Sequence, residues 1–286
     1  MDAPGAVVVR RYSRQRDAAV TVKINRPGEI GEYDQGMQTM LQLVWGEGFL
    51  SPGGAEEVAR VLEGVDIRGR RVLDIGSGLG AVDVLLVQQH GAGRVVGIEL
   101  EPDLIAQARV RVARHSLGDR IEFRQVSPGP LPFPSAGFDV VFSKDSLVQI
   151  PDKPALFAEI RRVLVPRGLL VAGDWLRGGS GPYSEEMLEY FRLEGITYNL
   201  ASADDTAAAL RLAGFTGIEV RDRTDWYRAL AERELASIKG EWFAVMESRL
   251  GRARALHFIA NWQQLVRVLQ RGELRPAHVR ARSATQ

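Results

Sequence analysis

The chain has 286 residues, of which 45% are hydrophobic and 26% are charged, a composition typical of a globular protein. Its 37 basic and 36 acidic side chains leave a formal net charge of +1. This balance argues against a nucleic-acid-binding protein, because such proteins need a clustered basic excess. The absence of cysteine excludes disulfides, thiolate metal sites and cysteine nucleophiles.

The sequence also argues against a metal site and a membrane span. No two of its four histidines lie three or four residues apart. No stretch approaches the roughly 18 apolar residues that cross a bilayer, and Met1–Gly5 leads into no apolar targeting segment. We therefore expect a cytoplasmic protein with no metal and no membrane partner.

Residues 1–28 form a predicted N-terminal β arm. The β-branched runs Ala6–Arg10 and Ala19–Ile24 predict two short strands. An unpaired strand offers its backbone groups to another chain. We hypothesise that this arm joins two copies of the chain into a homo-oligomer.

Residues 29–66 are predicted to be a helical lid that covers the cofactor. Apolar residues recur there at helical spacing, at Met37, Met40, Leu41, Val44 and Trp45. Glycines at 46 and 48 end this helix, and a second one follows over Ala55–Leu62.

Residues 67–223 alternate between short apolar runs and helical stretches, which predicts a cofactor-binding domain. The predicted strands are Arg71–Ile75, Arg94–Ile98, Ile121–Gln125, Phe138–Phe142, Leu169–Ala172 and Phe215–Arg221. The predicted helices are Ala81–Gln89, Pro102–Arg114, Lys153–Leu164 and Ser202–Ala213. This order indicates an α/β fold with a Rossmann-like, doubly wound, mostly parallel sheet.

Residues 224–272 are predicted to be a helical cap over the carboxyl edge of the sheet. Within them, the spacing of Leu256, Ile259, Ala260, Gln263 and Val266 predicts the inward face of a helix. Residues 273–286 complete the sheet and form a tail. The alternation in Leu274–Arg280 is typical of an edge strand.

The most informative segment is the glycine-rich turn after the first strand. Gly76, Ser77 and Gly78 follow that strand directly, and Asp74 stands two residues before the turn. Glu99 ends the second strand, where a carboxylate can accept both hydroxyls of a ribose. A carboxylate at Asp74 would repel a pyrophosphate and attract a cation. This favours S-adenosylmethionine over a dinucleotide, with a purely structural glycine turn as the third interpretation.

The run Val72–Gly80, together with Gly97-Ile98-Glu99, resembles the class I S-adenosylmethionine-dependent methyltransferases. The resemblance implies that Gly76 and Gly78 pass beside the methionine part of the cofactor, that Glu99 binds its ribose and that Asp74 supports the loop. The family often has an acidic residue after the third strand, where this chain has Ser127, so the adenine contacts are expected from backbone or Val126. The other residues expected to contact the cofactor are Leu50, Ser51, Ser77, Leu100 and Ser143.

Two stretches, one from Tyr33 to Gly54 and the other over Phe142–Gln149, are similar to phosphoethanolamine N-methyltransferases. In those enzymes a lid tyrosine and a histidine form a catalytic pair, with an aspartate four residues before the histidine. Tyr33 and Asp145 match this pattern, and Gln149 replaces the histidine. A glutamine cannot take a proton near neutral pH, so no general base is expected at that position. By their positions in this resemblance, the catalytic candidates are Tyr33, Asp145 and Gln149.

The same resemblance places Glu194 where the group has a phosphate-binding arginine. A carboxylate there would repel a phosphate, whereas aromatic residues could hold an amine or an electron-rich ring such as an indole. The expected acceptor-binding residues are Trp45, Glu47, Trp175, Tyr190 and Glu194. We therefore predict methyl transfer to the amine nitrogen or electron-rich carbon of a small molecule. A phosphoethanolamine-type enzyme and a catalytically silent S-adenosylmethionine-binding subunit are the alternatives.

Several of these residues also have a purely structural interpretation. Asp145 could cap a turn, Tyr33 and Trp45 could pack within the lid, and Gln149 could hydrogen-bond locally. Lys144 is expected to be a solvated or capping charge. His257 and His278 are expected to be ordinary surface or packing residues.

Overall fold

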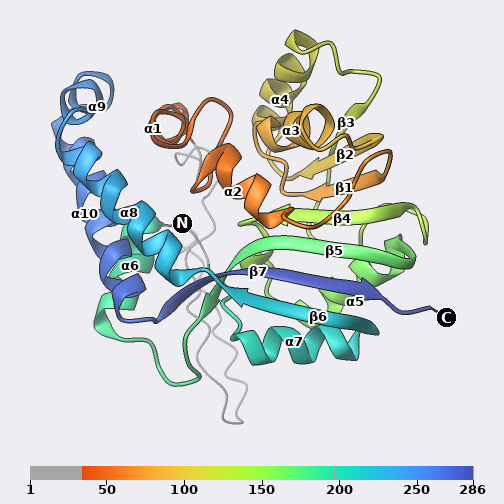
Figure 1. Cartoon of the computed structure of the whole chain (residues 1–286). Coiled ribbons are helices and arrows are strands. Elements are labelled where there is room, and N and C mark those ends of the chain that lie inside the picture. The colour runs from red at the N-terminus through yellow and green to blue at the C-terminus, as the bar shows by residue number, and fades with distance from the viewer. Residues whose placement is uncertain (1–33, 196–197, 286) are drawn as a thin grey trace, which may run out of the picture.

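The computed structural model describes residues 34–195 and 198–285. The predicted N-terminal arm and Tyr33 lie outside these residues. The described chain forms an α/β fold around one seven-stranded sheet in the order β3-β2-β1-β4-β5-β7-β6 (Figure 1). The strands are β1 Arg71–Ile75, β2 Arg94–Glu99, β3 Ile121–Gln125, β4 Phe138–Lys144, β5 Leu164–Arg177, β6 Phe215–Asp222 and β7 Leu274–Ser283.

The sheet is mostly parallel, as predicted. The neighbouring pairs from β3 through β5 are all parallel, and β7 runs antiparallel to both β5 and β6. The carboxyl ends of β1, β2, β4 and β5 therefore lie together at one edge, where sheets of this kind bind their ligands.

Helices cover both faces of the sheet. Alternate strand residues point to opposite faces, so Val72, Val95 and Val140 pack on one side with α2, α3 and α4, while Leu73, Val96 and Val141 pack on the other with α5 and α7. These helices are α2 Gly54–Val61, α3 Ala81–Gln88, α4 Pro102–Arg114, α5 Lys153–Val163 and α7 Ala203–Leu212.

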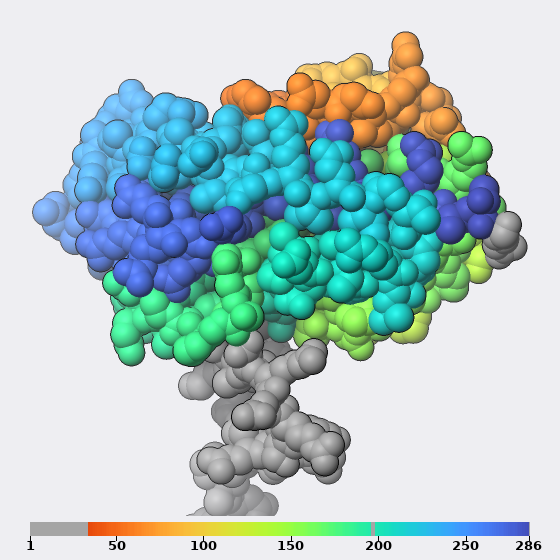
Figure 2. Space-filling view, turned by 60° about the horizontal axis from the view of Figure 1, so that its bottom comes forward, coloured from red at the N-terminus to blue at the C-terminus, as the bar shows by residue number. Residues whose placement is uncertain are grey.

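The remaining helices gather beyond the carboxyl edge of the parallel strands (Figure 1). They are α1 Gln35–Trp45, α6 Glu185–Glu194, α8 Thr224–Lys239, α9 Phe243–Leu250 and α10 Arg252–Gln270, and a short 3-10 helix spans Leu147–Gln149. Two apolar clusters hold them together, one between α6, α8 and α10 and one between α1, α9 and α10. Figure 2 shows α8 to α10 as a continuous mass at one end of the molecule. Helices α8, α9 and α10 come from the segment 224–272 that the sequence predicts to be a helical cap.

The prediction that the last strand lies at the edge was wrong, because β7 is inserted between β5 and the true edge strand β6. Its polar positions suggested contact with solvent, but they have partners inside the protein. His278 Nε2 lies 2.6 Å from the carboxylate of Glu57, and Arg280 donates to the carbonyl of Val61 at 2.8 Å. His278 is buried and paired, which agrees with the packing alternative and not with the surface one.

The predicted inward face of α10 was correct only in part, because Val266 is buried and Ile259 packs against the core, whereas other predicted positions are not buried. Leu256 is 47% exposed, and the residues that contact the core are Ala255, Phe258, Trp262, Leu265 and Leu269. Four of them, Ala255, Phe258, Trp262 and Leu265, each stand one position before a residue of the predicted face. Since α10 is packed against α6, α8, α9 and the sheet, its buried surface is broad and its apolar pattern fits more than one face.

Candidate functional site

The glycine-rich turn joins the end of β1 to the start of α3. Gly76, Gly78 and Gly80 have φ angles of 82°, 52° and 79°. Residues other than glycine rarely adopt this backbone conformation. A Cβ added at Gly76 would lie 2.0 Å from the hydroxyl of Ser146, so this position also has no room for a side chain. The turn therefore offers a ligand bare backbone.

The amides of this turn already have acceptors. The N–H groups of Gly76 and Ser77 both donate to the carbonyl of Ile98, at 2.9 and 3.1 Å. The N–H of Gly78 donates to Glu99 Oε2 at 3.0 Å. A pyrophosphate-binding turn needs these donors for its ligand. Their present use disfavours a dinucleotide.

Glu99 is held at the end of β2 by backbone donors. Its Oε1 accepts from Leu100 N at 2.6 Å and from Glu101 N at 3.3 Å, while Oε2 accepts from Gly78. The carboxylate stays partly exposed, so its remaining lone pairs can accept from hydroxyl groups of a ligand. This arrangement fits the expected ribose of S-adenosylmethionine.

Asp74 lies beneath the turn and not on its surface. It is buried next to Asp83 and Glu99, and Asp74 Oδ2, both carboxyl oxygens of Asp83 and the Ser77 hydroxyl have no hydrogen-bond partner among the described residues. Burial, and next the charges of Asp83 and Glu99, raise the pKa of Asp74 well above its usual value. Burial likewise raises the pKa of Asp83 to about 8. Positive charge on a ligand in the turn would offset this repulsion.

The other residues expected at the cofactor lie at the same strand ends. Val126 N donates to the carbonyl of Glu99 at 3.0 Å, and the side chains of Leu100 and Ser127 are exposed. Ser143 is different: its hydroxyl is fully buried and donates to the carbonyl of Ile75 at 2.8 Å. It joins β4 to β1 and does not face the open edge.

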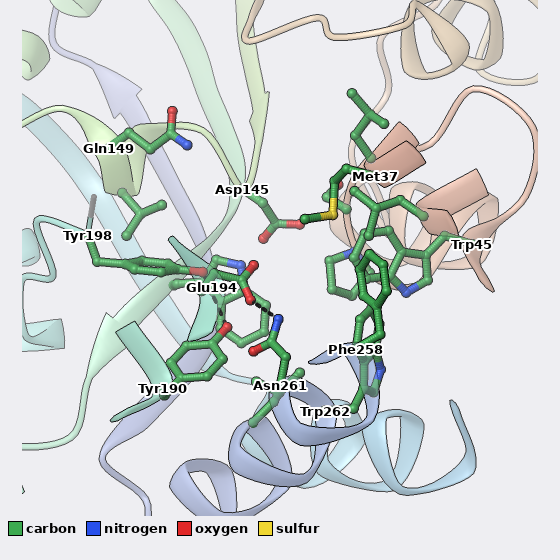
Figure 3. A pocket seen from close by; sticks show the side chains of 17 residues that line it. Met37, Trp45, Asp145, Gln149, Tyr190, Glu194, Tyr198, Phe258, Asn261 and Trp262 are labelled. Carbon is green, nitrogen blue, oxygen red and sulfur yellow. Dashed lines mark hydrogen bonds between the residues drawn. The ribbon is translucent and has the colours of Figure 1, made fainter. Parts of the chain in front are cut away.

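A pocket lies between the strand ends and the cap (Figure 3). It brings together eight of the residues predicted from the sequence, which are Trp45, Leu50, Ser51, Asp145, Gln149, Trp175, Tyr190 and Glu194. It also contains residues that were not predicted, which are Met37, Leu41, Pro52, Val148, Tyr198, Phe258, Asn261, Trp262 and Leu265. Four of these, at 258, 261, 262 and 265, follow helical spacing in α10, which is the sequence signal that could have identified them.

Glu47 does not belong to this pocket. Its side chain is 72% exposed and pairs with Arg111 of α4 at 3.1 Å. The expectation that Glu47 contacts the acceptor has no support in its position.

Asp145 forms an ion pair with Lys144 at the wall of the pocket. Lys144 Nζ donates to Asp145 Oδ2, Ser51 Oγ and Pro52 O, each at 2.7 Å. The Lys144 and Asp145 side chains are 2% and 5% exposed, so the expectation of a solvated lysine was wrong. Asp145 also has a φ of 57°, which is unusual for a residue with a side chain.

The second carboxyl oxygen of Asp145, Oδ1, has no partner among the described residues. Burial raises the pKa of Asp145, and the neighbouring Lys144 opposes this shift. The wall of the pocket thus contains a buried carboxylate oxygen that accepts no hydrogen bond from the described residues.

A second polar group occupies the α6 and α10 side of the pocket. Asn261 Nδ2 donates to Glu194 Oε2 at 2.5 Å, and the Tyr190 and Tyr198 hydroxyls lie 3.2 Å apart. Burial raises the pKa of Glu194, while hydrogen bonds from Asn261 and Tyr198 lower it. Asp145 and Glu194 are the two charged side chains among the described residues that line the pocket.

The aromatic wall is held by a buried carboxyl group. Trp45 Nε1 and Trp262 Nε1 donate to the two oxygens of Glu234, at 2.9 and 3.0 Å, and the two indoles lie 5.8 Å apart. Burial raises the pKa of Glu234 to about 7. Trp45 is therefore both part of the lid packing and part of the pocket wall.

Gln149 lies at the margin of the pocket, where the backbone joins it to the segment after α6. The carbonyl of Gln149 accepts from Asn199 Nδ2 at 2.8 Å, and Asn199 N donates to the carbonyl of Val148.

None of the described helices is both long and apolar enough to span a bilayer.

Known methyltransferases share this sequence pattern. Residues 72–168 match the family described as a methyltransferase domain. A phosphoethanolamine N-methyltransferase of Triticum aestivum is 33% identical over 199 residues, which cover 68% of this chain and 38% of that protein. The 27-O-demethylrifamycin SV methyltransferase of Amycolatopsis mediterranei is 30% identical over 254 residues, which cover 80% of this chain and 92% of that protein.

Solved structures share the fold. Phosphoethanolamine N-methyltransferase 2 of Haemonchus contortus, in complex with phosphomonomethylethanolamine and S-adenosylhomocysteine, has a TM-score of 0.79 at 23% identity, covering 89% of this chain and 59% of that one. A putative sarcosine dimethylglycine methyltransferase of Galdieria sulphuraria has a TM-score of 0.75 at 17% identity, covering 88% and 98%. The match thus spans less than two fifths of the wheat enzyme and nearly all of the Amycolatopsis and Galdieria proteins. From the sequence match and the fold together, the chain belongs to the class I S-adenosylmethionine-dependent methyltransferases.

Proposed function

We propose that this protein transfers a methyl group from S-adenosylmethionine to the amine nitrogen of a small molecule bound in the pocket between α1, α6 and α10. The observation that carries this proposal is the buried, unpartnered Oδ1 of Asp145, a residue that lines that pocket. A buried acceptor without a donor is costly, so a bound ligand that supplies an N–H is favoured there.

The cofactor residues fit the donor. The occupied amides of the turn and the carboxylate of Glu99 support a ligand with ribose hydroxyls and no pyrophosphate. When bound, S-adenosylmethionine supplies a methyl group already activated by its sulfonium charge. The protein can therefore contribute mainly by aligning the acceptor and excluding water.

Asp145 would hold the acceptor and take its proton. An amine that donates one N–H to Oδ1 keeps its lone pair directed elsewhere, and Oδ1 can receive the proton released as nitrogen gains its new bond. Lys144 holds Oδ2 and so fixes which oxygen faces the acceptor. The unusual φ of Asp145 supports a positioned group and not a simple turn cap.

The described pocket disfavours a phosphorylated acceptor. Its two charged lining residues are both acidic, and the nearby Lys144 already donates to three oxygens. A phosphate would therefore meet repulsion and find no basic side chain among the described residues that line the pocket. This separates the proposed acceptor from phosphoethanolamine, in spite of the similarity to those enzymes.

A second candidate is transfer to an electron-rich ring carbon. The aromatic side chains of Trp45, Phe258 and Trp262 favour it, since they could stack on a ring such as an indole. Asp145 would then receive the proton lost from the ring carbon.

Calorimetry and product analysis together test the proposal. S-adenosylhomocysteine should bind to the wild-type protein and to Asp145→Asn with similar affinity, whereas methyl transfer to a panel of amines should fall by about 100-fold or more in the variant. Asp225→Asn, at an exposed carboxylate in α8, is the matched control and should keep wild-type transfer. Unchanged amine methylation by Asp145→Asn would contradict the assigned role.

A further inference from the structure

We infer that the pocket has a second polar subsite, formed by Asn261 with Glu194, that recognises another hydrogen-bond donor of the acceptor. The inference rests on the proposed function, because it assumes that the acceptor occupies this pocket. It narrows the substrate class to amines that carry a second N–H or O–H group at a distance from the methylated nitrogen.

The subsite is built around an amide group with one unused atom. Asn261 is 6% exposed and lies on the inner face of α10. Its Nδ2 donates to Glu194 Oε2, while Oδ1 has no hydrogen-bond partner among the described residues. Asn261 is one of the residues that line the pocket, and its amide lies on the side of the pocket where Glu194 and Tyr190 are (Figure 3). A ligand donor that reaches this side of the pocket would supply the partner that Oδ1 lacks.

The orientation of the amide is set by its neighbours. Glu194 accepts hydrogen bonds from Asn261 and from the Tyr198 hydroxyl. Turning the amide over would bring its oxygen against the Glu194 carboxylate, with two acceptors facing each other. Glu194 therefore acts as the positioning residue, and Asn261 Oδ1 as the recognition atom.

The charges around the pocket favour a donor on the ligand. Asp145 and Glu194 give the described lining two acidic groups and no basic one. An acceptor molecule with a donor at each end and an apolar or aromatic body would satisfy both Asp145 Oδ1 and Asn261 Oδ1 and pack against Trp45, Phe258 and Trp262. A molecule with a single amine would leave Asn261 Oδ1 buried without a partner.

Matched pairs of amines test the subsite. The probes are phenethylamine against tyramine and hexylamine against 1,6-diaminohexane, titrated into the full chain saturated with S-adenosylhomocysteine. In at least one pair, the member with the second donor should bind about tenfold tighter, the gain typical of one added buried hydrogen bond. The same preference should appear as a lower KM, with kcat less affected, when methyl transfer is followed by mass spectrometry.

Variants test whether the preference for probes with a second donor depends on the Asn261 side-chain amide. Asn261→Leu should remove the difference within the pair, and Glu194→Gln should reduce it by freeing the amide to turn. Gln263→Leu, on the same helix but outside the pocket, is the control and should keep the difference. Unchanged S-adenosylhomocysteine affinity will show that each variant is folded.

The outcomes separate the two proposals. Equal affinity within every pair, including no binding by either member, would overturn the subsite, as would a preference that survives in Asn261→Leu. Preferential binding of the donor-bearing probes without any methyl transfer would support the subsite and contradict the proposed function. Methylation of both members with equal KM would support the function and contradict the subsite.

Discussion

The ammonium group of Lys144 lies 2.7 Å from the carboxylate of Asp145 and the same distance from the carbonyl of Pro52. One buried cation thus joins the end of β4 to the segment between α1 and α2. Leu50, Ser51 and Pro52 in that segment line the pocket, so its position depends on this contact. The lid and the proposed proton acceptor are held by the same side chain.

Removing the cation should be strongly destabilising. Lys144→Met leaves the Asp145 carboxylate buried without its counter-charge, and we expect a loss of about 3–5 kcal/mol in the free energy of unfolding, measured by chemical denaturation. The double variant Lys144→Met, Asp145→Leu should lose less than the single variant, because it also removes the buried charge. A double variant less stable than Lys144→Met would contradict a buried, coupled pair.

Alanine substitutions at two glycines of the turn should differ in the size of their effects. Gly76→Ala should reduce S-adenosylhomocysteine affinity and thermal stability more than Gly78→Ala. The added Cβ would lie 2.0 Å from Ser146 Oγ at position 76, but 3.6 Å from the nearest atom at position 78, and both positions have positive φ. Adding Ser146→Gly to Gly76→Ala should recover part of the loss. Equal effects at the two glycines would show that the turn adjusts freely.

Glu99 should control cofactor affinity. Glu99→Ala removes a carboxylate that accepts from three backbone N–H groups and faces the expected ribose, so binding of S-adenosylhomocysteine should weaken by about tenfold or more in calorimetry. The neighbouring exposed Glu101→Ala is the control. Wild-type affinity in Glu99→Ala would remove the ribose-binding role.

The buried acids predict how stability depends on pH. Burial raises the pKa of Asp83 to about 8 and those of Asp174 and Glu234 to about 7, so between pH 5 and 8 the folded chain holds protons that the unfolded chain has lost. The free energy of unfolding should therefore fall as the pH rises through this range.

Differential scanning fluorimetry without cofactor should give a higher melting temperature at pH 5.5 than at pH 8.5. Asp83→Asn should reduce the slope, because the variant has no proton to lose at that position. A melting temperature that rises across this range would contradict the assigned burial of these acids.

Much of the fold could be predicted, because the residues that indicate each strand and helix lie within or next to that element in the sequence. The ranges of β1 and β3 agree with the predicted ones, since each is a short apolar run followed by a turn or helix signal. Ser202, the first residue of a predicted helix, is the N-cap of α7, and its hydroxyl accepts from Asp205 N. Such features depend on neighbours a few residues away.

The parts that failed depend on contacts between distant residues. Lys144 is buried because Ser51 and Pro52, more than 90 positions earlier, supply its acceptors. The predicted edge strand β7 is an inner strand, and its His278 pairs with Glu57, 221 positions earlier. Asn261 follows the helical spacing of the pocket-lining residues of α10, but its pairing with Glu194, 67 positions earlier, is a contact that spacing does not show. The residues at the strand ends could therefore be predicted from local sequence more completely than the pocket residues on α10.

The central claim is that an amine bound at Asp145 receives the methyl group. The most direct test incubates the protein with deuteromethyl-labelled S-adenosylmethionine and a pool of small-molecule amines, indoles and phosphoethanolamine, and locates the label by tandem mass spectrometry. We expect the label on an amine nitrogen, and its loss in Asp145→Asn. Label on phosphoethanolamine alone, or no labelled product in the whole pool, would contradict the claim.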